Sequence, residues 1–150
     1  MTYVECPNKT EEKKLSLFLA GGLSGCRNWQ KQVISNLNFL DIILYNPRRK
    51  YFDITNPDIA EEQIVWEEEM IRKSDLVSFY FCRETVCPIT LYELGVCNEM
   101  KDKPVVLGMD PDYSRRFDVE KQTKLKKPHT LIVYGLEDLS ESIINIFRNW

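Results

Sequence analysis

Leu15-Ser16-Leu17-Phe18-Leu19-Ala20 is the stretch that decides the fold, because it is a nearly continuous apolar run of strand length. Runs of this kind are typical of parallel strands that are covered on both faces. Four more such runs follow along the chain, at Leu40–Tyr45, Leu76–Phe81, Pro104–Gly108 and Thr130–Tyr134. The sequence therefore predicts five buried strands.

Segments with helical periodicity separate these strands. The predicted helices are Asn28–Leu37, Ile59–Lys73, Thr90–Met100 and Glu137–Arg148, with a weaker candidate near Val119–Lys126. Strands that alternate with helices indicate repeated β-α units. We therefore predict an α/β fold, a single-domain, doubly wound, five-stranded parallel sheet of flavodoxin-like or Rossmann-like order.

The carboxyl ends of the strands are where such a sheet binds its ligand. We therefore expect the chemistry to lie in the loops that follow the strands, namely Gly21–Arg27, Asn46–Pro57, Cys82–Ile89 and Met109–Asp118.

Length and composition set the domain count and exclude some classes of partner. The 150 residues suit one domain, which we place at residues 15–150, after a loose polar leader at residues 1–14. Twenty basic and 23 acidic side chains leave a net charge of -3, which gives no electrostatic reason to bind a nucleic acid polymer or an anionic membrane. The N-terminus lacks an apolar signal region, and no stretch approaches the roughly 20 apolar residues of a membrane span.

The five cysteines are odd in number, form no CxxC pair and are accompanied by a single histidine, His129. This pattern favours reduced and mostly buried thiols over a disulfide or a metal site. We therefore expect a cytoplasmic protein without a metal ion.

Two loops carry residues that suit an anionic or polar ligand. The glycines of Gly21–Gly25 let a ligand approach the backbone before a helix start, although a simple turn needs glycines as well. The pair Arg48 and Arg49 follows a strand, where arginines bind carboxylates and phosphates or form an ordinary solvated surface. The sequence leaves both alternatives open in each loop.

Two glutamates are candidates for catalysis. Glu68 and Glu69 have basic partners four residues downstream in the predicted helix, whereas Glu67 has none, so it lies at the edge of the buried face or in a cleft. Glu93 follows the loop Cys82–Ile89, in the first turn of the next predicted helix. The helix dipole there would favour its ionised form. Thr90-x-x-Glu93 also matches a capping box, and a glutamate held by a cap would be a poor nucleophile.

Residues 15–125 resemble the nucleoside 2-deoxyribosyltransferase family and its relatives, the nucleotide N-glycosidases. The resemblance rests on Leu17–Gly22, Asn46–Arg49, Trp66-Glu67 ahead of Lys73–Asp75, and Pro88–Gly95 with its Tyr-Glu-Leu-Gly end. It implies that Glu93 is the nucleophile and that Glu67 positions or protonates the leaving base. Cys87 stands where these transferases have aspartate and the hydrolases have serine.

The resemblance also implies a set of substrate-binding residues and an assembly. The expected binding residues are Phe18, Gly21, Gly22, Asn46, Arg48, Arg49, Cys87, Thr90, Tyr92 and Asp118. Of these, Asp118 is the nearest match to a polar residue that reaches a neighbouring subunit's site. We expect a homodimer or higher homo-oligomer that needs no cofactor.

Three functions compete at this stage. The leading hypothesis is transfer of 2-deoxyribose, or ribose, from a nucleoside to a free nucleobase by double displacement through Glu93. The second is hydrolysis of a nucleoside or nucleoside 5′-monophosphate, with Arg115-Arg116 or the Gly21–Gly25 loop holding the phosphate. The third is a non-catalytic nucleotide sensor, which has no use for a nucleophilic carboxylate.

Overall fold

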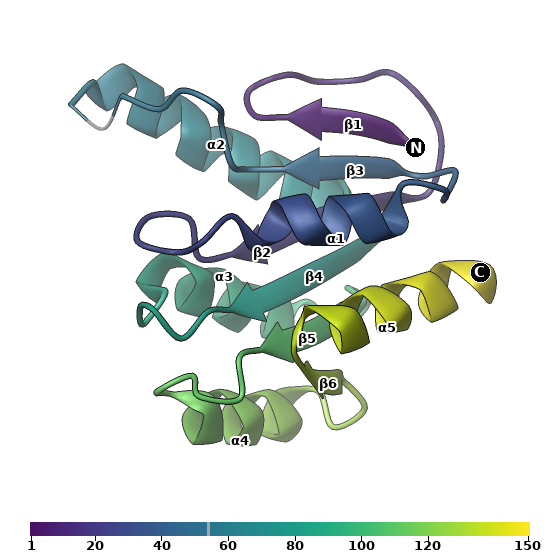
Figure 1. Cartoon of the computed structure of the whole chain (residues 1–150). Coiled ribbons are helices and arrows are strands. Elements are labelled where there is room, and N and C mark those ends of the chain that lie inside the picture. The colour runs from purple at the N-terminus through teal and green to yellow at the C-terminus, as the bar shows by residue number, and fades with distance from the viewer. Residues whose placement is uncertain (54) are drawn as a thin grey trace.

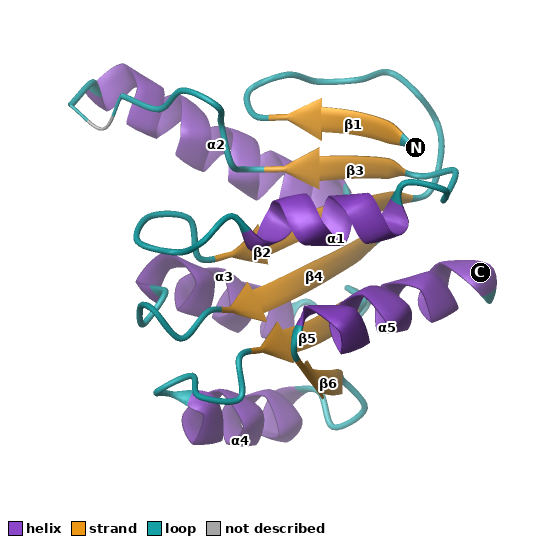
Figure 2. Ribbon diagram, in the orientation of Figure 1, coloured by secondary structure: helices purple, strands orange, loops and turns teal. Residues whose placement is uncertain are grey.

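Six parallel strands form one sheet in the computed structural model, which describes residues 1–53 and 55–150 (Figures 1 and 2). The strands are β1 Thr2–Glu5, β2 Ser16–Gly21, β3 Ile43–Asn46, β4 Leu76–Phe81, β5 Val105–Met109 and β6 Leu131–Tyr134. Ile54, within the loop predicted at Asn46–Pro57, lies outside the described residues. The α/β parallel architecture confirms the predicted fold class.

The strand order is β1-β3-β2-β4-β5-β6. If β1 is left out, the strand order is the flavodoxin-like order predicted from the sequence. In this order the chain runs from the central strand β2 first to one edge of the sheet and then to the other. The chain leaves β2 towards β3 on one side and returns to β4 on the other. The switch point of the sheet therefore lies between the carboxyl ends of β2 and β4.

The sixth strand corrects the predicted count of five and the expectation of a loose leader at residues 1–14. β1 pairs in parallel with β3, from Thr2 beside Ile43 to Glu5 beside Asn46. It is a short edge strand in which Val4 is buried while Tyr3 is 45% exposed. Only one of its four residues is buried, so β1 gives no apolar run. The opposite edge strand, β6, does give such a run but is partly exposed, which corrects the prediction that all the strands are buried.

Five helices in the described part of the chain connect the strands: α1 Trp29–Leu37, α2 Pro57–Lys73, α3 Pro88–Glu99, α4 Arg116–Lys126 and α5 Leu136–Arg148. All five were predicted, with boundaries that differ by up to three residues. In Figure 1, α1 and α5 lie on one face of the sheet and α2, α3 and α4 on the other. Within the described residues, no helix combines the length and apolar character needed to cross a membrane.

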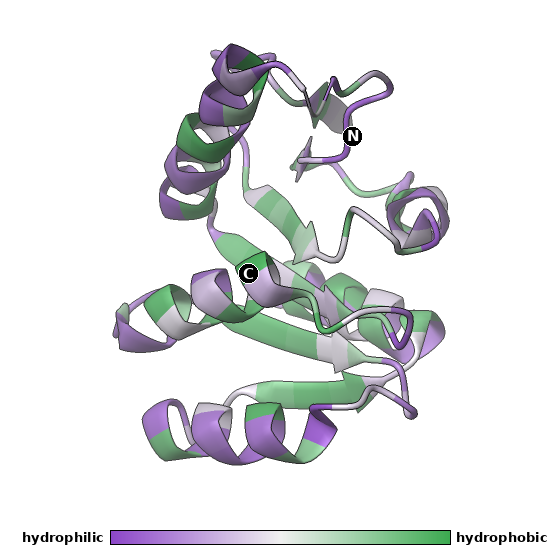
Figure 3. Cartoon of the chain, turned by 90° about the vertical axis from the view of Figure 1, so that its left-hand side faces the viewer, coloured by the Kyte–Doolittle hydropathy of each residue, from purple (hydrophilic) through white to green (hydrophobic). Residues whose placement is uncertain are grey.

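The central strands are the best-covered part of the molecule. Every residue of β2 and of β4 is buried, and Figure 3 shows hydrophobic strands enclosed by helices with hydrophilic outer faces. Trp29 of α1 packs on Tyr80 of β4 with ring centroids 5.2 Å apart. Close packing on both faces fixes the positions of the loops that leave Gly21 and Phe81.

We predict that Val4→Ala lowers the free energy of unfolding by about 1–2 kcal/mol, because it removes buried methyl groups from β1. Denaturant unfolding measures the loss. Lys13→Ala, at an exposed position in the same N-terminal segment, is the control and should change stability little. Equal stability of the two variants would contradict the place of β1 in the sheet.

Candidate functional site

A cleft of about 350 Å³ lies at the switch point of the sheet. Its walls come from the end of β2 and the loop after it, from α2, and from the segment that leads into α3. Ligands of doubly wound sheets bind at this position. Of the residues expected to act there, the cleft collects Gly21, Gly22, Glu67, Cys87, Thr90 and Glu93.

Glu93 stands in the second turn of α3. The helix begins at Pro88, two residues before the predicted start, because proline at the first helical position has its φ angle already set and lacks only an N–H that would be unpaired anyway. The N-cap is Cys87, in the left-handed region with φ 51°, and no side chain caps the helix. The predicted Thr90–Glu93 capping box is therefore wrong, and Glu93 is not held by a cap.

Burial raises the pKa of the Glu93 carboxyl to about 8, and the nearby charges of Glu67 and Glu68 add to the rise. This result corrects the expectation that the helix dipole keeps Glu93 ionised. The dipole acts within the first turn, and the larger effects here are loss of water and repulsion between like charges. Glu93 therefore holds a proton at neutral pH in the free protein.

Glu67 lines the same cleft and has a partner that lies upstream. Its Oε1 accepts a hydrogen bond of 2.6 Å from Nε2 of Gln63, one helical turn earlier in α2. Burial raises the pKa of Glu67, while the hydrogen bond from Gln63 and the charge of Arg49 lower it. The interpretation that Glu67 turns into a cleft is correct, and its lack of a downstream ion pair was the signal.

Gln63 is a site residue that the sequence did not reveal. Besides Glu67, its Nε2 reaches the carbonyl oxygen of Pro47 at 2.8 Å, and its Oε1 accepts a hydrogen bond of 2.7 Å from Arg49. The i,i+4 spacing of Gln63 and Glu67 was a usable signal, since such pairs face each other on a helix. Gln63 thus holds one oxygen of Glu67, and no hydrogen bond to the other oxygen is found among the described residues.

Arg48 and Arg49 are bound by other parts of the protein and do not line the cleft. Nη2 of Arg48 donates to the carbonyl oxygens of Leu23 at 3.1 Å and Gly22 at 3.3 Å, and its Nε donates to Gln30 at 2.9 Å. Arg49 pairs with Glu62 at 2.8 Å. The two arginines line an adjoining pocket of about 250 Å³, which shares Leu23, Phe52 and Gln63 with the cleft.

Four other expected binding residues lie away from the cleft. Phe18 is fully buried in β2, with its ring centroid 6.1 Å from that of Trp66. Asn46 donates to the Tyr3 hydroxyl and accepts from the backbone of Arg48.

Tyr92 and Asp118 lie on the surface. Tyr92 is 73% exposed, and Asp118, in the first turn of α4, pairs with Arg115 at 3.3 Å. A contact of Asp118 with a neighbouring subunit stays a prediction.

Much of the remaining cleft wall is apolar. Leu23, Phe52, Ile64 and Ile89 line it, and Ile64 and Ile89 are each about two-thirds exposed, at 65% and 66%. They come from loops and helix positions far apart in the chain. A purely local pattern cannot show that such residues share one wall.

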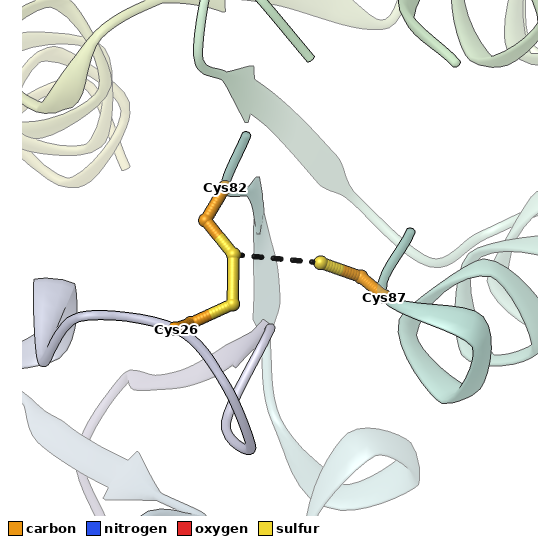
Figure 4. A group of neighbouring side chains, drawn as sticks. All are labelled: Cys26, Cys82 and Cys87. Carbon is orange, nitrogen blue, oxygen red and sulfur yellow. Dashed lines mark hydrogen bonds between the residues drawn. A yellow bond between two sulfur atoms is a disulfide. The ribbon is translucent and has the colours of Figure 1, made fainter. Parts of the chain in front are cut away.

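Cys26 and Cys82 form a disulfide, which corrects the expectation that all cysteines are reduced. They are 56 residues apart, but each follows one of two neighbouring strands, β2 and β4, whose carboxyl ends meet. Cys87 lies beside them, with its Sγ 3.6 Å from that of Cys82 (Figure 4). Cys6, Cys87 and Cys97 are free and buried, as predicted.

The fold and the cleft define a doubly wound α/β protein with two carboxyl groups in a site at the switch point of its sheet. Residues 14–113 match the model of the family described as "Nucleoside 2-deoxyribosyltransferase like", and the chain belongs to this family. The resemblance seen in the sequence is thereby confirmed. Family membership indicates an enzyme-like role in handling nucleosides.

Among solved structures, the chain is similar to a conserved protein from Enterococcus faecalis V583. The TM-score is 0.55 at 20% sequence identity, and the match covers 89% of this chain and 99% of that one. At this identity the similarity supports the fold alone. No curated protein matches the chain.

We predict that Arg48→Ala lowers the free energy of unfolding by about 1–3 kcal/mol, because carbonyl oxygens of the loop after β2 lose a charged donor. The matched control is Arg27→Ala, since Arg27 is 54% exposed and its contacts are long, with ion pairs of 3.7 and 3.9 Å and a hydrogen bond of 3.4 Å to the Tyr80 hydroxyl, so its loss should cost about 0.5 kcal/mol or less. If Arg48→Ala instead weakens substrate binding at unchanged stability, Arg48 binds substrate rather than the loop.

Proposed function

We propose that the chain transfers 2-deoxyribose, or ribose, from a nucleoside to a free nucleobase, with Glu93 as the nucleophile. The observation that carries this proposal is the pair of partly buried, electrostatically coupled carboxyl groups, Glu93 and Glu67, in one cleft. Most enzymes that cleave glycosidic bonds use two carboxyl groups in different environments, one as an acid or base and the other as a nucleophile or base. The family to which the chain belongs supports a nucleoside as the substrate.

The two carboxyl groups share protons rather than titrate independently. Because the charge of Glu67 raises the pKa of Glu93, removing a proton from one makes the next harder to remove. At neutral pH the pair therefore holds a proton, chiefly on Glu93. In the reactive arrangement Glu93 is ionised and the proton is on Glu67. Burial also raises the pKa of Glu67, so Glu67 can hold this proton.

The proposed reaction has two displacements at C1′ of the sugar. The Glu93 carboxylate attacks C1′, the bond from C1′ to the base nitrogen breaks, and Glu67 gives the departing base its proton. A glycosyl-enzyme ester on Glu93 results. A second base then attacks C1′ while Glu67 takes back a proton, so that the sugar leaves Glu93 with its original configuration.

The apolar walls of the cleft favour transfer over hydrolysis. Leu23, Phe52, Ile64 and Ile89 offer flat apolar contact to a nucleobase and few partners to water. Arg115 and Arg116, the sequence-based candidates to hold a phosphate, lie at the start of α4. There Arg115 pairs with Asp118, and Arg116 pairs with Glu120. Because neither arginine lines the cleft, they do not support binding of a nucleotide phosphate there by a hydrolase.

We also propose that the protein works as a homodimer or higher homo-oligomer. Apolar side chains at the mouth of the cleft are exposed, among them Ile64 and Ile89, and Tyr92 is exposed on the adjoining helix face. A second copy that covers this surface would bury the apolar groups and keep water from the glycosyl-enzyme.

We predict that Glu93→Gln abolishes turnover and raises stability near pH 7 by on the order of 2 kcal/mol. Between the ordinary pKa of 4.5 and the raised value of about 8, the unfolded chain has lost the proton that folded Glu93 keeps. The stability of the parent therefore falls as pH rises through this window, and glutamine removes that loss.

Chemical denaturation at pH 5, 7 and 8.5, together with a nucleoside cleavage assay, tests this prediction. Glu141→Gln, exposed on α5, is the control and should behave like the parent in both measurements. Near-normal turnover of Glu93→Gln would refute the nucleophile assignment.

We predict that kcat/KM of the parent falls as pH rises through about 8, because the pair then loses the proton that Glu67 must give to the leaving base. In Glu67→Gln only Glu93 titrates and the like charge is gone, so kcat/KM should instead rise with pH, with a midpoint below 8. Turnover of ordinary nucleosides should fall about 10²–10⁴-fold, and less for an activated leaving base. An unshifted pH profile would show that the two carboxyl groups do not interact.

The direct test of transfer is a partition experiment. Thymidine or deoxyinosine is incubated with the protein, with and without adenine, and the products are separated by chromatography. We expect new deoxyadenosine to exceed free sugar when adenine is present at about millimolar concentration, the upper range of typical KM values. Mostly free sugar at saturating adenine would establish a hydrolase, and no cleavage of any nucleoside would favour a binding protein.

A further inference from the structure

Three sulfur atoms gather where the loop after β2, the end of β4 and the start of α3 meet. They belong to Cys26, Cys82 and Cys87, and all lie within 4.8 Å of one another (Figure 4). The disulfide uses two of them. The third, Cys87, has no part in that bond, although its sulfur faces it at 3.6 Å.

The three sulfur atoms are packed tightly against neighbouring backbone. The Cys87 thiol lies 3.6 Å from the carbonyl oxygen of Thr85, to which it donates, and the Thr85 hydroxyl lies 3.9 Å from the Cys87 sulfur. A Cβ at Gly22 would come within 2.9 Å of the Cys87 sulfur and closer still to the other two. Only glycine therefore fits beside the cluster.

The spacing also suits a metal ion. Zinc–thiolate bonds are about 2.3 Å long, so two sulfurs on one tetrahedral zinc lie about 3.8 Å apart. Cys82 and Cys87 have nearly this separation, at 3.6 Å. Once the disulfide is reduced, rotation of the Cys26 side chain, which lies in a partly exposed loop, can bring the third sulfur to a similar distance.

We propose that Cys26, Cys82 and Cys87, when reduced, bind one thiophilic metal ion such as Zn²⁺, and that the disulfide is the oxidised, metal-free form of this site. Among the described residues, the ligand group consists of these three cysteines alone. Thiolate ligands select Zn²⁺ or Cu⁺ over Mg²⁺ or Ca²⁺. Two protein sulfurs cannot be joined to each other and serve as thiolate ligands together, so oxidation and metal binding exclude one another.

The chemistry balances with a dithiol as the reductant. The dithiol gives two electrons and two protons to the Cys26–Cys82 bond and becomes a disulfide itself. The three protein thiols then lose their protons as the metal–sulfur bonds form. Gly22 and Cys87 line the cleft, so both the disulfide form and the metal-bound form affect the shape of its wall. The metal-bound form also connects the start of α3 to the segments that follow β2 and β4.

Metal content of the 150-residue chain tests the proposal without any substrate, so its outcome is independent of the proposed transfer reaction. One sample is oxidised, and one is reduced with a dithiol that is then removed under nitrogen. Both are exposed to excess Zn²⁺, desalted and measured by mass spectrometry of the bound metal. We expect one zinc per reduced chain and none per oxidised chain, and Co²⁺ should give thiolate charge-transfer absorbance only in the reduced chain.

Three variants test whether zinc binding depends on the cysteines of the cluster. Cys26→Ser and Cys87→Ser should each weaken zinc binding at least tenfold in the reduced state. Cys97→Ser, which changes a buried thiol outside the cluster, should bind zinc like the parent. Circular dichroism confirms that each sample is folded. A folded, reduced parent that binds no zinc, or equal binding by Cys87→Ser and Cys97→Ser, would overturn the proposal.

Discussion

Backbone pairing between β2 and β4, in a register that runs from Leu17 beside Leu76 to Gly21 beside Tyr80, holds the centre of the molecule. Both strands are buried throughout, so this pairing is protected from water and closely packed. It fixes the distance between the loops that leave the two strands. The cleft, the disulfide and the start of α3 all depend on that distance, because each joins residues that follow β2 to residues that follow β4.

The site between these two strands holds a carboxyl group, Glu93, whose ionised form is energetically unfavourable. The raised pKa of Glu93 means that the fold places a carboxyl group where its charged form is disfavoured, next to a second carboxyl group. Such an arrangement costs stability and suits chemistry in which one group must give a proton and the other an electron pair. Gln63, held in turn by Arg49, keeps Glu67 in place at the edge of this pair.

The sequence was most informative where burial is continuous and least informative where contacts are distant. Apolar runs located the four inner strands and the edge strand β6, which is partly exposed rather than buried, whereas the opposite edge strand β1 gave no such run. The motif around Glu93 identified a cleft residue, but Pro88 moved the helix start and removed the predicted cap. The roles of Arg48 and the pairing of Cys26 with Cys82 depend on partners far along the chain, which a local pattern does not contain.

The central claim is that Glu93 forms a covalent bond to the sugar. Mass spectrometry of the protein, quenched with acid during turnover of a deoxynucleoside without an acceptor base, tests this claim most directly. The account predicts a mass increase equal to one deoxyribosyl group, located by fragmentation on the Glu93 side chain and absent from Glu93→Gln. Turnover that leaves the protein unmodified at every quench time, or that labels another residue, would contradict it.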